Sequence, residues 1–246
     1  MKIDVFFQAG EAAALNMVDH TVVVIDVLRA TSTMVEALVN GGRGVYPVAS
    51  TEEAIRLASS LGREDTLLCG ESQGLMIDGF DLGNSPREFV RERVADKRLV
   101  MSTTNGTGAF LMAEDAGRVL VCCFLNLDAV VDAVAAVEQL VVVCAGREGR
   151  FSADDALCAG VLLGRLQAGN AGEIELNDAG QAALALAGKF RVSADFLALT
   201  DGGQSLVEIG FHEDLKHCAQ LDRYAVVPEM EDRVIHVPAL NARGSE

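Results

Sequence analysis

Residues 70–89, GESQGLMIDGFDLGNSPREF, form a glycine-rich segment between two strand-like runs at residues 66–69 and 98–101. The segment is too long and too rich in glycine to be a simple turn. Two further polar segments, residues 26–33 (DVLRATST) and 102–107 (STTNGT), each follow an apolar run. In parallel α/β sheets, ligands bind beyond the carboxyl ends of the strands. We therefore expect the three segments to meet at one site for an anionic ligand, with a divalent metal.

Strands and helices alternate along the chain, which predicts an α/β fold built on a mostly parallel sheet with helices on both faces. The run TVVVI at residues 21–25 is continuously apolar, as expected of a strand buried on both faces. Further strands are expected at residues 3–7, 44–48, 66–69, 98–101, 119–123 and 140–144, and an edge hairpin at residues 224–227 and 233–237. Helices are expected at residues 31–39, 51–60, 86–94, 106–113, 127–137, 153–166, 178–187, 194–199 and 213–221.

No Pro- or Ser-rich linker interrupts the chain, so residues 1–246 are predicted to form one domain. A boundary near residues 147–152 is the alternative. It would divide the chain into two α/β lobes around a cleft.

The net charge of −16, from 36 acidic and 20 basic residues, argues against nucleic acid and anionic lipid, so we expect neither partner. The longest apolar stretch, residues 127–144, contains three acidic residues and is therefore not predicted to cross a membrane. The N-terminal apolar run is too short for a signal peptide, and the six cysteines form no Cys-x-x-Cys pair. These features predict a cytoplasmic protein with buried thiols. The sequence leaves open whether it forms a homo-oligomer.

Acidic side chains at the predicted strand ends are candidate metal ligands. Asp26 follows the run at residues 21–25, Glu71 follows the run at residues 66–69, and Asp81 lies in the glycine-rich segment. Mg²⁺ prefers a few carboxylates and several retained waters. A Mg²⁺ ion at Asp26, Glu71 and Asp81 would neutralise a phosphoryl group and stabilise the charge that develops during its transfer.

Cations and polar groups at the same strand ends are candidates for holding the oxyanion. Arg29 and Arg147 could contact a phosphate through two parallel N–H donors. The predicted start of the next helix offers backbone N–H and hydroxyl groups at Thr104, Asn105, Gly106 and Thr107. We expect Asp26, Arg29 and Asn105 to be the catalytic residues and the others to bind substrate.

Each candidate also has a structural alternative. Asp26 could cap the turn after its strand, Asp81 could form a turn beside glycine, and Asn105 could be an ordinary helix cap. The chain contains neither Gly-x4-Gly-Lys-Ser/Thr nor Gly-x-Ser-x-Gly, so a Walker-type nucleotide loop and a serine-hydrolase elbow are not expected. Its four histidines form no zinc pattern.

The motifs DVLRAT (residues 26–31), GE (70–71), GFDLGNSP (79–86) and TTNGT (103–107) occur in this order along the chain. In sequence and spacing they resemble the 2-phosphosulfolactate phosphatase (ComB) family, and the likeness covers nearly the whole chain. The resemblance implies an α/β fold peculiar to that family. It also implies a Mg²⁺-dependent phosphatase that hydrolyses 2-phospho-3-sulfolactate to 3-sulfolactate and phosphate in coenzyme M biosynthesis. The matching positions add Thr31 and Asn84 to the expected substrate-binding residues.

Three positions depart from the family pattern. Ser72, Met76 and Gly108 stand where the resemblance leads us to expect basic residues. Because 2-phospho-3-sulfolactate carries three anionic groups, a less charged phosphate ester is an alternative substrate. Two other functions also fit the same anion site. One is a metabolite-binding protein without turnover, and the other is a metal-dependent lyase or isomerase.

Overall fold

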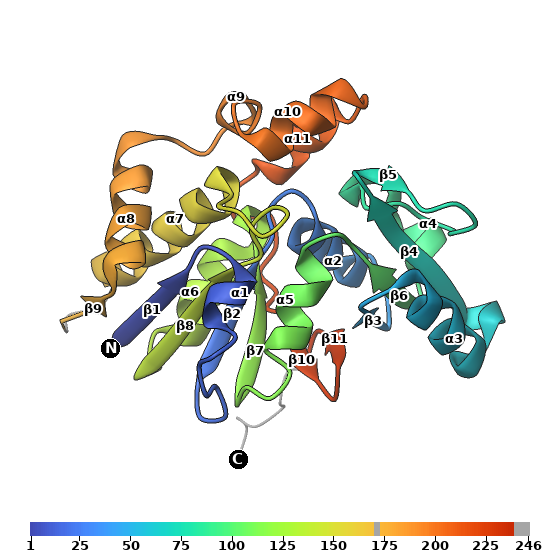
Figure 1. The fold of residues 1–246 in the computed structure, drawn as a ribbon, viewed down its shortest axis with the longest axis horizontal. Coiled ribbons are helices and arrows are strands. Elements are labelled where there is room, and N and C mark those ends of the chain that lie inside the picture. The colour runs from blue at the N-terminus through green and yellow to red at the C-terminus, as the bar shows by residue number, and fades with distance from the viewer. Residues whose placement is uncertain (170–172, 239–246) are drawn as a thin grey trace, which may run out of the picture.

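The computed structural model describes residues 1–169 and 173–238. Its strands form one mixed sheet (Figure 1) in the order β5-β4-β6-β3-β11-β10-β7-β2-β8-β1-β9. The strands are β1 (Lys2–Phe6), β2 (Thr21–Ile25), β3 (Gly44–Pro47), β4 (Thr66–Ser72), β5 (Leu75–Met76), β6 (Arg98–Ser102), β7 (Arg118–Cys122), β8 (Gln139–Cys144), β9 (Glu175–Leu176), β10 (Glu229–Glu231) and β11 (Val234–His236).

Helices alternate with most of these strands, as the sequence predicts. They are α1 (Ala9–Ala12), α2 (Ala30–Val39), α3 (Thr51–Leu61), α4 (Arg91–Val94), α5 (Gly106–Met112), α6 (Leu127–Val134), α7 (Ala153–Gly169), α8 (Asp178–Lys189), α9 (Ala194–Leu197), α10 (Asp201–Glu208) and α11 (His212–Cys218). Short 3₁₀ turns lie at η1 (Arg63–Asp65), η2 (Pro86–Glu88) and η3 (Phe124–Asn126). Within the described ranges, no helix combines the length and apolarity that crossing a lipid bilayer requires.

The parallel strands form two groups, β4-β6-β3 and β7-β2-β8-β1-β9. The antiparallel hairpin β10–β11 joins them, with β10 beside β7 and β11 beside β3. The neighbouring pairs β7–β10, β10–β11 and β11–β3 are each antiparallel. Three reversals of direction lie between β7 and β3, so the two parallel groups run in opposite directions. In Figure 1 they lie on either side of the hairpin and are turned relative to each other.

The hairpin is predicted at residues 224–227 and 233–237, but its first strand lies at Glu229–Glu231 instead. Its predicted position at the sheet edge is also wrong, because it lies in the middle of the sheet. Glu229 and Met230 pair with Leu120 and Val119 on one side, and Ile235 pairs with Val45 on the other. Both strands are only three residues long, which is typical of an edge, yet each has a neighbour on both sides.

Three hydrophobic clusters cover the sheet in the described residues, and two of them lie on opposite faces of β2. Along β2, Val22 and Val24 pack in one cluster with α2 and α5, whereas Val23 and Ile25 pack in the other with α6, α7 and α8. Successive side chains of a strand point to opposite faces, so an apolar residue at every position requires cover on both sides. The predicted helices on both faces are confirmed.

The segment after the glycine-rich loop differs from the helix predicted at residues 86–94. It forms the 3₁₀ turn η2 and then the four-residue helix α4. Ser85 does not cap this segment, because its hydroxyl donates to Asp214 Oδ1 (2.7 Å). Glu88 accepts from the Gly83 amide (3.0 Å). Ser85 therefore joins this loop to α11.

Candidate active site

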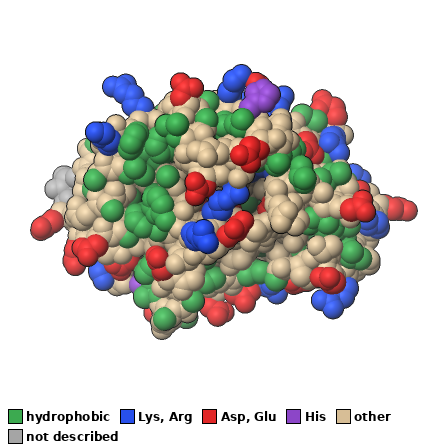
Figure 2. All heavy atoms as spheres, turned by 45° about the horizontal axis from the view of Figure 1, so that its top comes forward, with side chains coloured by type: hydrophobic (Ala, Val, Ile, Leu, Met, Phe, Trp, Pro, Cys, Tyr) green, Lys and Arg blue, Asp and Glu red, His purple; other side chains and the backbone are tan. Residues whose placement is uncertain are grey.

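A polar cavity lies where the segments after β2, β4, β6 and β8 approach α10. Figure 2 shows acidic and basic side chains side by side around a hollow near the middle of this face. The cavity is lined by Asp26, Leu28, Arg29, Glu71, Gln73, Gly74, Asn84, Thr103, Thr104, Asn105, Arg147, Glu148, Gly202, Ser205, Leu206 and Ile209. The three segments expected to converge therefore do so, although their strands belong to two groups of opposite direction.

Asp26 is the first residue after β2, and its side chain is buried. Its Oδ1 accepts a hydrogen bond from the Ala30 amide (3.0 Å) at the start of α2. Burial raises the pKa of Asp26 to about 7. The Asp154 and Glu71 carboxylates act in the same direction, while the Ala30 hydrogen bond and Arg29 oppose them. A buried acid with such a pKa in a polar cavity is a candidate functional group.

Arg29 lines the same cavity, with its guanidinium held on three sides. Nη1 donates to Asp214 Oδ2 (2.8 Å), Nη2 donates to the Gly74 carbonyl (2.6 Å), and the Phe211 ring lies 4.6 Å from the guanidinium carbon. Arg29 is 3% exposed, and Asp214 is fully buried. The guanidinium is therefore fixed in orientation, and its charge is already paired.

Glu71 connects the end of β4 with the segment after β6. Its Oε1 accepts from the Thr104 amide (2.7 Å), and its Oε2 accepts from the Gly74 amide (2.6 Å) in the tight turn before β5. These bonds hold the carboxylate in the cavity wall. Each oxygen retains a lone pair, because a carboxylate has about four acceptor sites.

Asn84, near the end of the glycine-rich loop, is buried in the cavity wall. Its backbone carbonyl accepts from the Thr33 hydroxyl (2.9 Å), which fixes the loop against α2. Its side-chain Oδ1 is buried and has no hydrogen-bond partner among the described residues. Leaving a buried acceptor unpaired costs about 1–3 kcal/mol, so this oxygen is a candidate contact for a ligand.

The segment after β8 forms the opposite wall of the cavity. The Glu148 amide donates to Asn105 Oδ1 (2.8 Å), and Arg147 Nη2 donates to the Ser205 hydroxyl of α10 (2.8 Å). Asn105 thus holds this segment in place, and Arg147 faces a lining rich in acids without forming an ion pair among the described residues.

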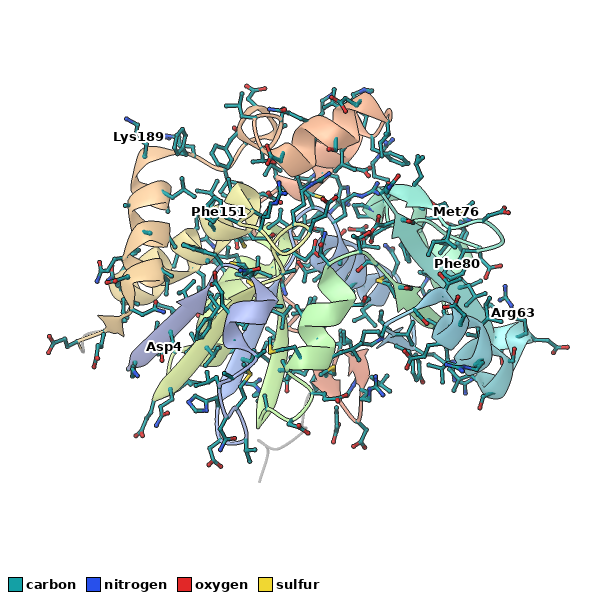
Figure 3. All side chains as sticks on the ribbon, viewed as in Figure 1. Asp4, Arg63, Met76, Phe80, Phe151 and Lys189 are labelled. Atoms are coloured by element: carbon teal, nitrogen blue, oxygen red, sulfur yellow. The ribbon has the colours of Figure 1, made fainter. Side chains whose placement is uncertain are left out.

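Some predicted residues are not among those that line the cavity. Asp81 Oδ2 accepts from Arg63 Nη2 (2.7 Å) and from the Leu68 amide (2.7 Å), and Figure 3 places Arg63 at the outer end of the molecule. Thr31 donates to the Asp26 carbonyl (2.7 Å) and closes the turn after β2, and the Thr107 amide donates to the Thr103 hydroxyl (3.1 Å). The structure therefore does not bring Asp81 to Asp26 and Glu71. Gly106 is also not among the residues that line the cavity, but it packs against Asp26.

Two further acids lie behind Asp26, in the first turn of α7. Asp155 accepts from the amides of Val27 (2.8 Å) and Gly146 (3.1 Å), so it fastens the ends of β2 and β8 together. Asp154 accepts from the Ser152 hydroxyl (2.6 Å). Burial raises the pKa of both side chains, and for Asp155 the neighbouring Asp154 and Asp26 add to the effect.

Comparison with known proteins assigns the chain to a family. A family model described as 2-phosphosulpholactate phosphatase matches residues 8–233. The chain belongs to the 2-phosphosulfolactate phosphatase family. The resemblance seen in the motifs is thereby confirmed.

Relatives in this family match over most of their length, and each is named "Probable 2-phosphosulfolactate phosphatase". The protein from Caldanaerobacter subterraneus is 37% identical over 222 residues, covering 89% of this chain and 91% of the relative. Those from Symbiobacterium thermophilum and Clostridium perfringens are both 39% identical, over 217 and 236 residues. These matches cover 87% and 94% of this chain, and 93% and 94% of the two relatives.

Sequence reasoning missed α10, which supplies Gly202, Ser205 and Leu206 to the cavity of this family member. Two adjacent glycines in its first turn argue against a helix. Packing requires one of them, because a Cβ at Gly203 would lie 1.8 Å from the Leu197 carbonyl oxygen. The Thr200 side chain, which accepts from the Gly203 amide (3.0 Å), is the capping signal that could have revealed the helix.

The donor set of the cavity fits Mg²⁺. Among the described residues, no three His, Cys, Asp or Glu side chains are arranged to hold a metal ion. Mg²⁺ needs only one or two carboxylates, because it keeps several waters. Asp26 and Glu71 provide two carboxylates, and the unpaired Oδ1 of Asn84 provides a third hard oxygen in the same lining.

Proposed function

We propose that this protein is a Mg²⁺-dependent phosphatase that hydrolyses 2-phospho-3-sulfolactate to 3-sulfolactate and phosphate. The observation that carries the proposal is the meeting of Asp26, Glu71, Asn84 and two arginines in one cavity of a chain from this family. The names of the relatives support the same substrate.

The charge of the cavity supports a role for a divalent cation. The lining holds three carboxylates, those of Asp26, Glu71 and Glu148, against two guanidiniums. One of the guanidiniums, Arg29, is already paired with Asp214. A phosphate ester entering this lining would face uncompensated negative charge. Bound at Asp26, Glu71 and Asn84, Mg²⁺ would supply positive charge and polarise the phosphoryl group.

The protein's own groups would orient the ester within the cavity. Arg29 keeps three of its five N–H donors after its contacts with Asp214 and Gly74, and these can bind a phosphoryl oxygen. Arg147 lies on the wall formed with α10 and could hold a second anionic group. In the reaction, a water oxygen forms the new bond to phosphorus and gives up a proton, the ester P–O bond breaks, and the leaving oxygen takes up a proton.

The positions that depart from the family pattern do not themselves line the cavity. Ser72, Met76 and Gly108 are not among the described residues that line the cavity, and Met76 is 52% exposed. The cavity wall nevertheless contains the basic residues Arg29 and Arg147.

The test is to incubate the purified chain with 2-phospho-3-sulfolactate and measure free phosphate, with Mg²⁺ and with a chelator. We expect release that requires Mg²⁺ and that exceeds release from a panel of simple phosphate esters. Tight binding measured by calorimetry without release from any ester would instead indicate a metabolite-binding protein. Loss of substrate without free phosphate would indicate a lyase or isomerase.

A further inference from the structure

Asp214 on α11 is the buried partner of Arg29. One carboxylate oxygen accepts from Arg29 Nη1 (2.8 Å), and the other accepts from the Ser85 hydroxyl (2.7 Å). Asp214 is fully buried and does not line the cavity, so it would act on a ligand only through Arg29. Because Ser85 adjoins Asn84, Asp214 connects the segment after β2, the glycine-rich loop and α11.

Three contacts fix the orientation of the Arg29 guanidinium, but only one of them balances its charge. Asp214, the Gly74 carbonyl and the Phe211 ring together fix the plane of the guanidinium. Of these three groups, only Asp214 is charged, and at 2.8 Å inside the protein it offsets the guanidinium charge. Breaking one side of a buried pair leaves the other charge uncompensated.

We propose that Asp214 is a positioning residue that orients Arg29 and cancels its charge, so that Arg29 offers directional N–H donors and not a free cation. The metal, and not Arg29, would then neutralise the negative charge of the substrate. Because Arg29 carries no uncompensated charge, free phosphate would bind weakly after hydrolysis. This role rests on the proposed phosphatase function, but its effect on anion binding can be measured without turnover.

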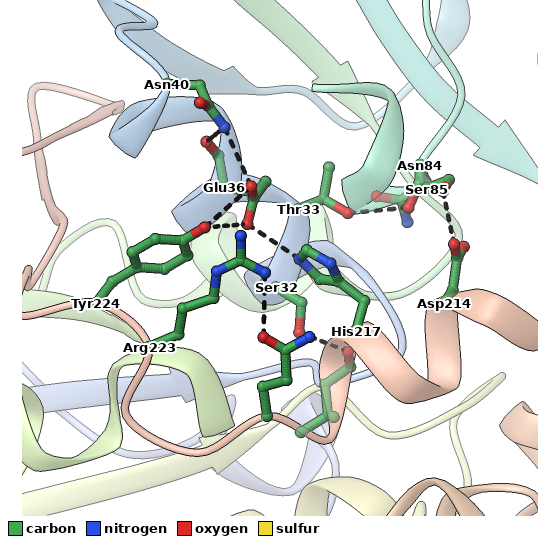
Figure 4. Close-up of polar contacts among 12 residues, drawn as sticks. Ser32, Thr33, Glu36, Asn40, Asn84, Ser85, Asp214, His217, Arg223 and Tyr224 are labelled. Atoms are coloured by element: carbon green, nitrogen blue, oxygen red, sulfur yellow. Dashed lines mark hydrogen bonds and ion pairs between the residues drawn. The ribbon is translucent and has the colours of Figure 1, made fainter. Parts of the chain in front are cut away.

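A second contact of α11 provides a matched control (Figure 4). His217, about one turn after Asp214, lies 3.0 Å from Glu36 Oε2 of α2, and Tyr224 donates to the same carboxylate (2.9 Å). This cluster anchors α11 to α2, as the Asp214 pair does. None of the three residues lines the cavity. A change at His217 therefore loosens α11 without changing the charge beside Arg29.

The decisive variant is Asp214→Asn, which keeps the shape and removes the charge. The new amide can accept from Arg29 and donate to the Ser85 hydroxyl, which can act as an acceptor. We expect inorganic phosphate, measured by calorimetry without Mg²⁺, to bind about tenfold more tightly, an effect the size of one charge-assisted hydrogen bond. With Mg²⁺ and a phosphate ester, KM should fall and kcat should fall with it. His217→Gln should leave phosphate affinity, KM and kcat within about twofold of the native values while lowering the thermal midpoint.

The second variant, Asp214→Glu, keeps the charge and displaces the carboxylate by one methylene. It should leave phosphate affinity nearly unchanged and lower kcat about tenfold or more, because Arg29 is moved. The proposal is overturned if Asp214→Asn binds phosphate no more tightly than the native chain, or if His217→Gln reproduces its effects. Native kcat in Asp214→Glu would overturn the orienting role. If no ester is hydrolysed but the shift in phosphate affinity occurs, the positioning role stands and the proposed phosphatase function fails.

Discussion

Gly106 lies so close to Asp26 that a Cβ atom at position 106 would stand 2.6 Å from Asp26 Oδ2 and 2.4 Å from the Ala30 Cβ. Real Cβ atoms do not approach other heavy atoms at these distances, so only glycine fits here. The main chain at the start of α5 is thereby packed directly against the buried acid after β2. This contact joins the two groups of strands at the cavity itself.

The variant Gly106→Ala should damage the site more than the fold. Relieving the overlap requires moving Asp26 or α5, and overpacking of this kind costs about 1–3 kcal/mol of the free energy of unfolding. We expect phosphatase activity to fall by about 100-fold, because a displacement of about 1 Å can cost that much. Gly108→Ala is the control on the same helix, since a Cβ at position 108 meets nothing within 4 Å. It should keep full activity and gain up to about 1 kcal/mol of stability. Equal activity in the two variants would contradict this account of the contact.

Asp26 and Asp81 provide a paired test of which carboxylate serves the reaction. Asp26→Asn should lower kcat by about 10²–10³-fold and abolish the rise in thermal midpoint on adding Mg²⁺. Asp81→Asn removes the partner of Arg63 outside the cavity. It should cost about 1 kcal/mol of stability and leave activity within about twofold of the native value. Native activity in Asp26→Asn, or a lost response to Mg²⁺ in Asp81→Asn, would exclude the proposed ligand set.

Most helices and strands could be predicted because the residues that determine them lie within or directly beside each element. The apolar run of β2 has the predicted bounds, since a strand covered on both faces needs apolar residues at every position. The helix predicted at residues 51–60 forms as α3, and the Ser50 side chain directly before it accepts from the Glu53 amide (3.2 Å), as a serine at a helix start commonly does. The position of the β10–β11 hairpin was not predictable, because it depends on β3 and β7, which lie more than 100 residues earlier in the chain.

The residues of the site and its surroundings likewise divide into those that local patterns predict and those that only the fold reveals. Asp26 and Asn105 follow strand ends, and Glu71 lies near the end of β4, where polar residues after apolar runs mark a ligand site. Asp81 also lies in the glycine-rich segment, but its neighbour in space is Arg63, and nothing in the local pattern shows that pairing. Asp214 reaches Arg29 from 185 residues away, so only the folded chain reveals it.

Because the side-chain oxygen of Asn84 is buried without a partner among the described residues, we predict that removing it lowers activity with little change in stability. In Asn84→Ala, the lost packing is offset by removal of a buried, unsatisfied acceptor worth about 1–3 kcal/mol, so the free energy of unfolding should change by less than about 1 kcal/mol. Activity should fall at least about tenfold, because a contact for the ligand is lost. Ser85→Ala is the comparison at the next position, and it should lose stability because Asp214 loses a donor. Chemical denaturation and phosphate-release assays on both variants measure these effects. A large loss of stability in Asn84→Ala with full activity would show that the oxygen is structural.

We predict that Glu36, which does not line the cavity, makes the stability of the fold depend on pH. Burial alone would raise the pKa of Glu36, but hydrogen bonds from His217 and Tyr224 outweigh it and lower the pKa below its ordinary value of 4.5. The folded state therefore holds a proton at Glu36 less readily than the unfolded state does. The stability that Glu36 contributes is fully present above pH 4.5 and is lost as the pH falls through the lowered value.

Denaturation of the native chain and of Glu36→Gln, compared from pH 7 to pH 3, measures this contribution. The native chain should be the more stable at pH 7, and the difference should shrink steadily below about pH 4.5. The variant keeps a hydrogen-bonding side chain of the same size, so the comparison isolates the charge. Activity at pH 7 should be unchanged, because Glu36 is not among the residues that line the cavity. A difference in stability that stays constant down to pH 3 would mean that the carboxylate titrates alike in the folded and unfolded chains.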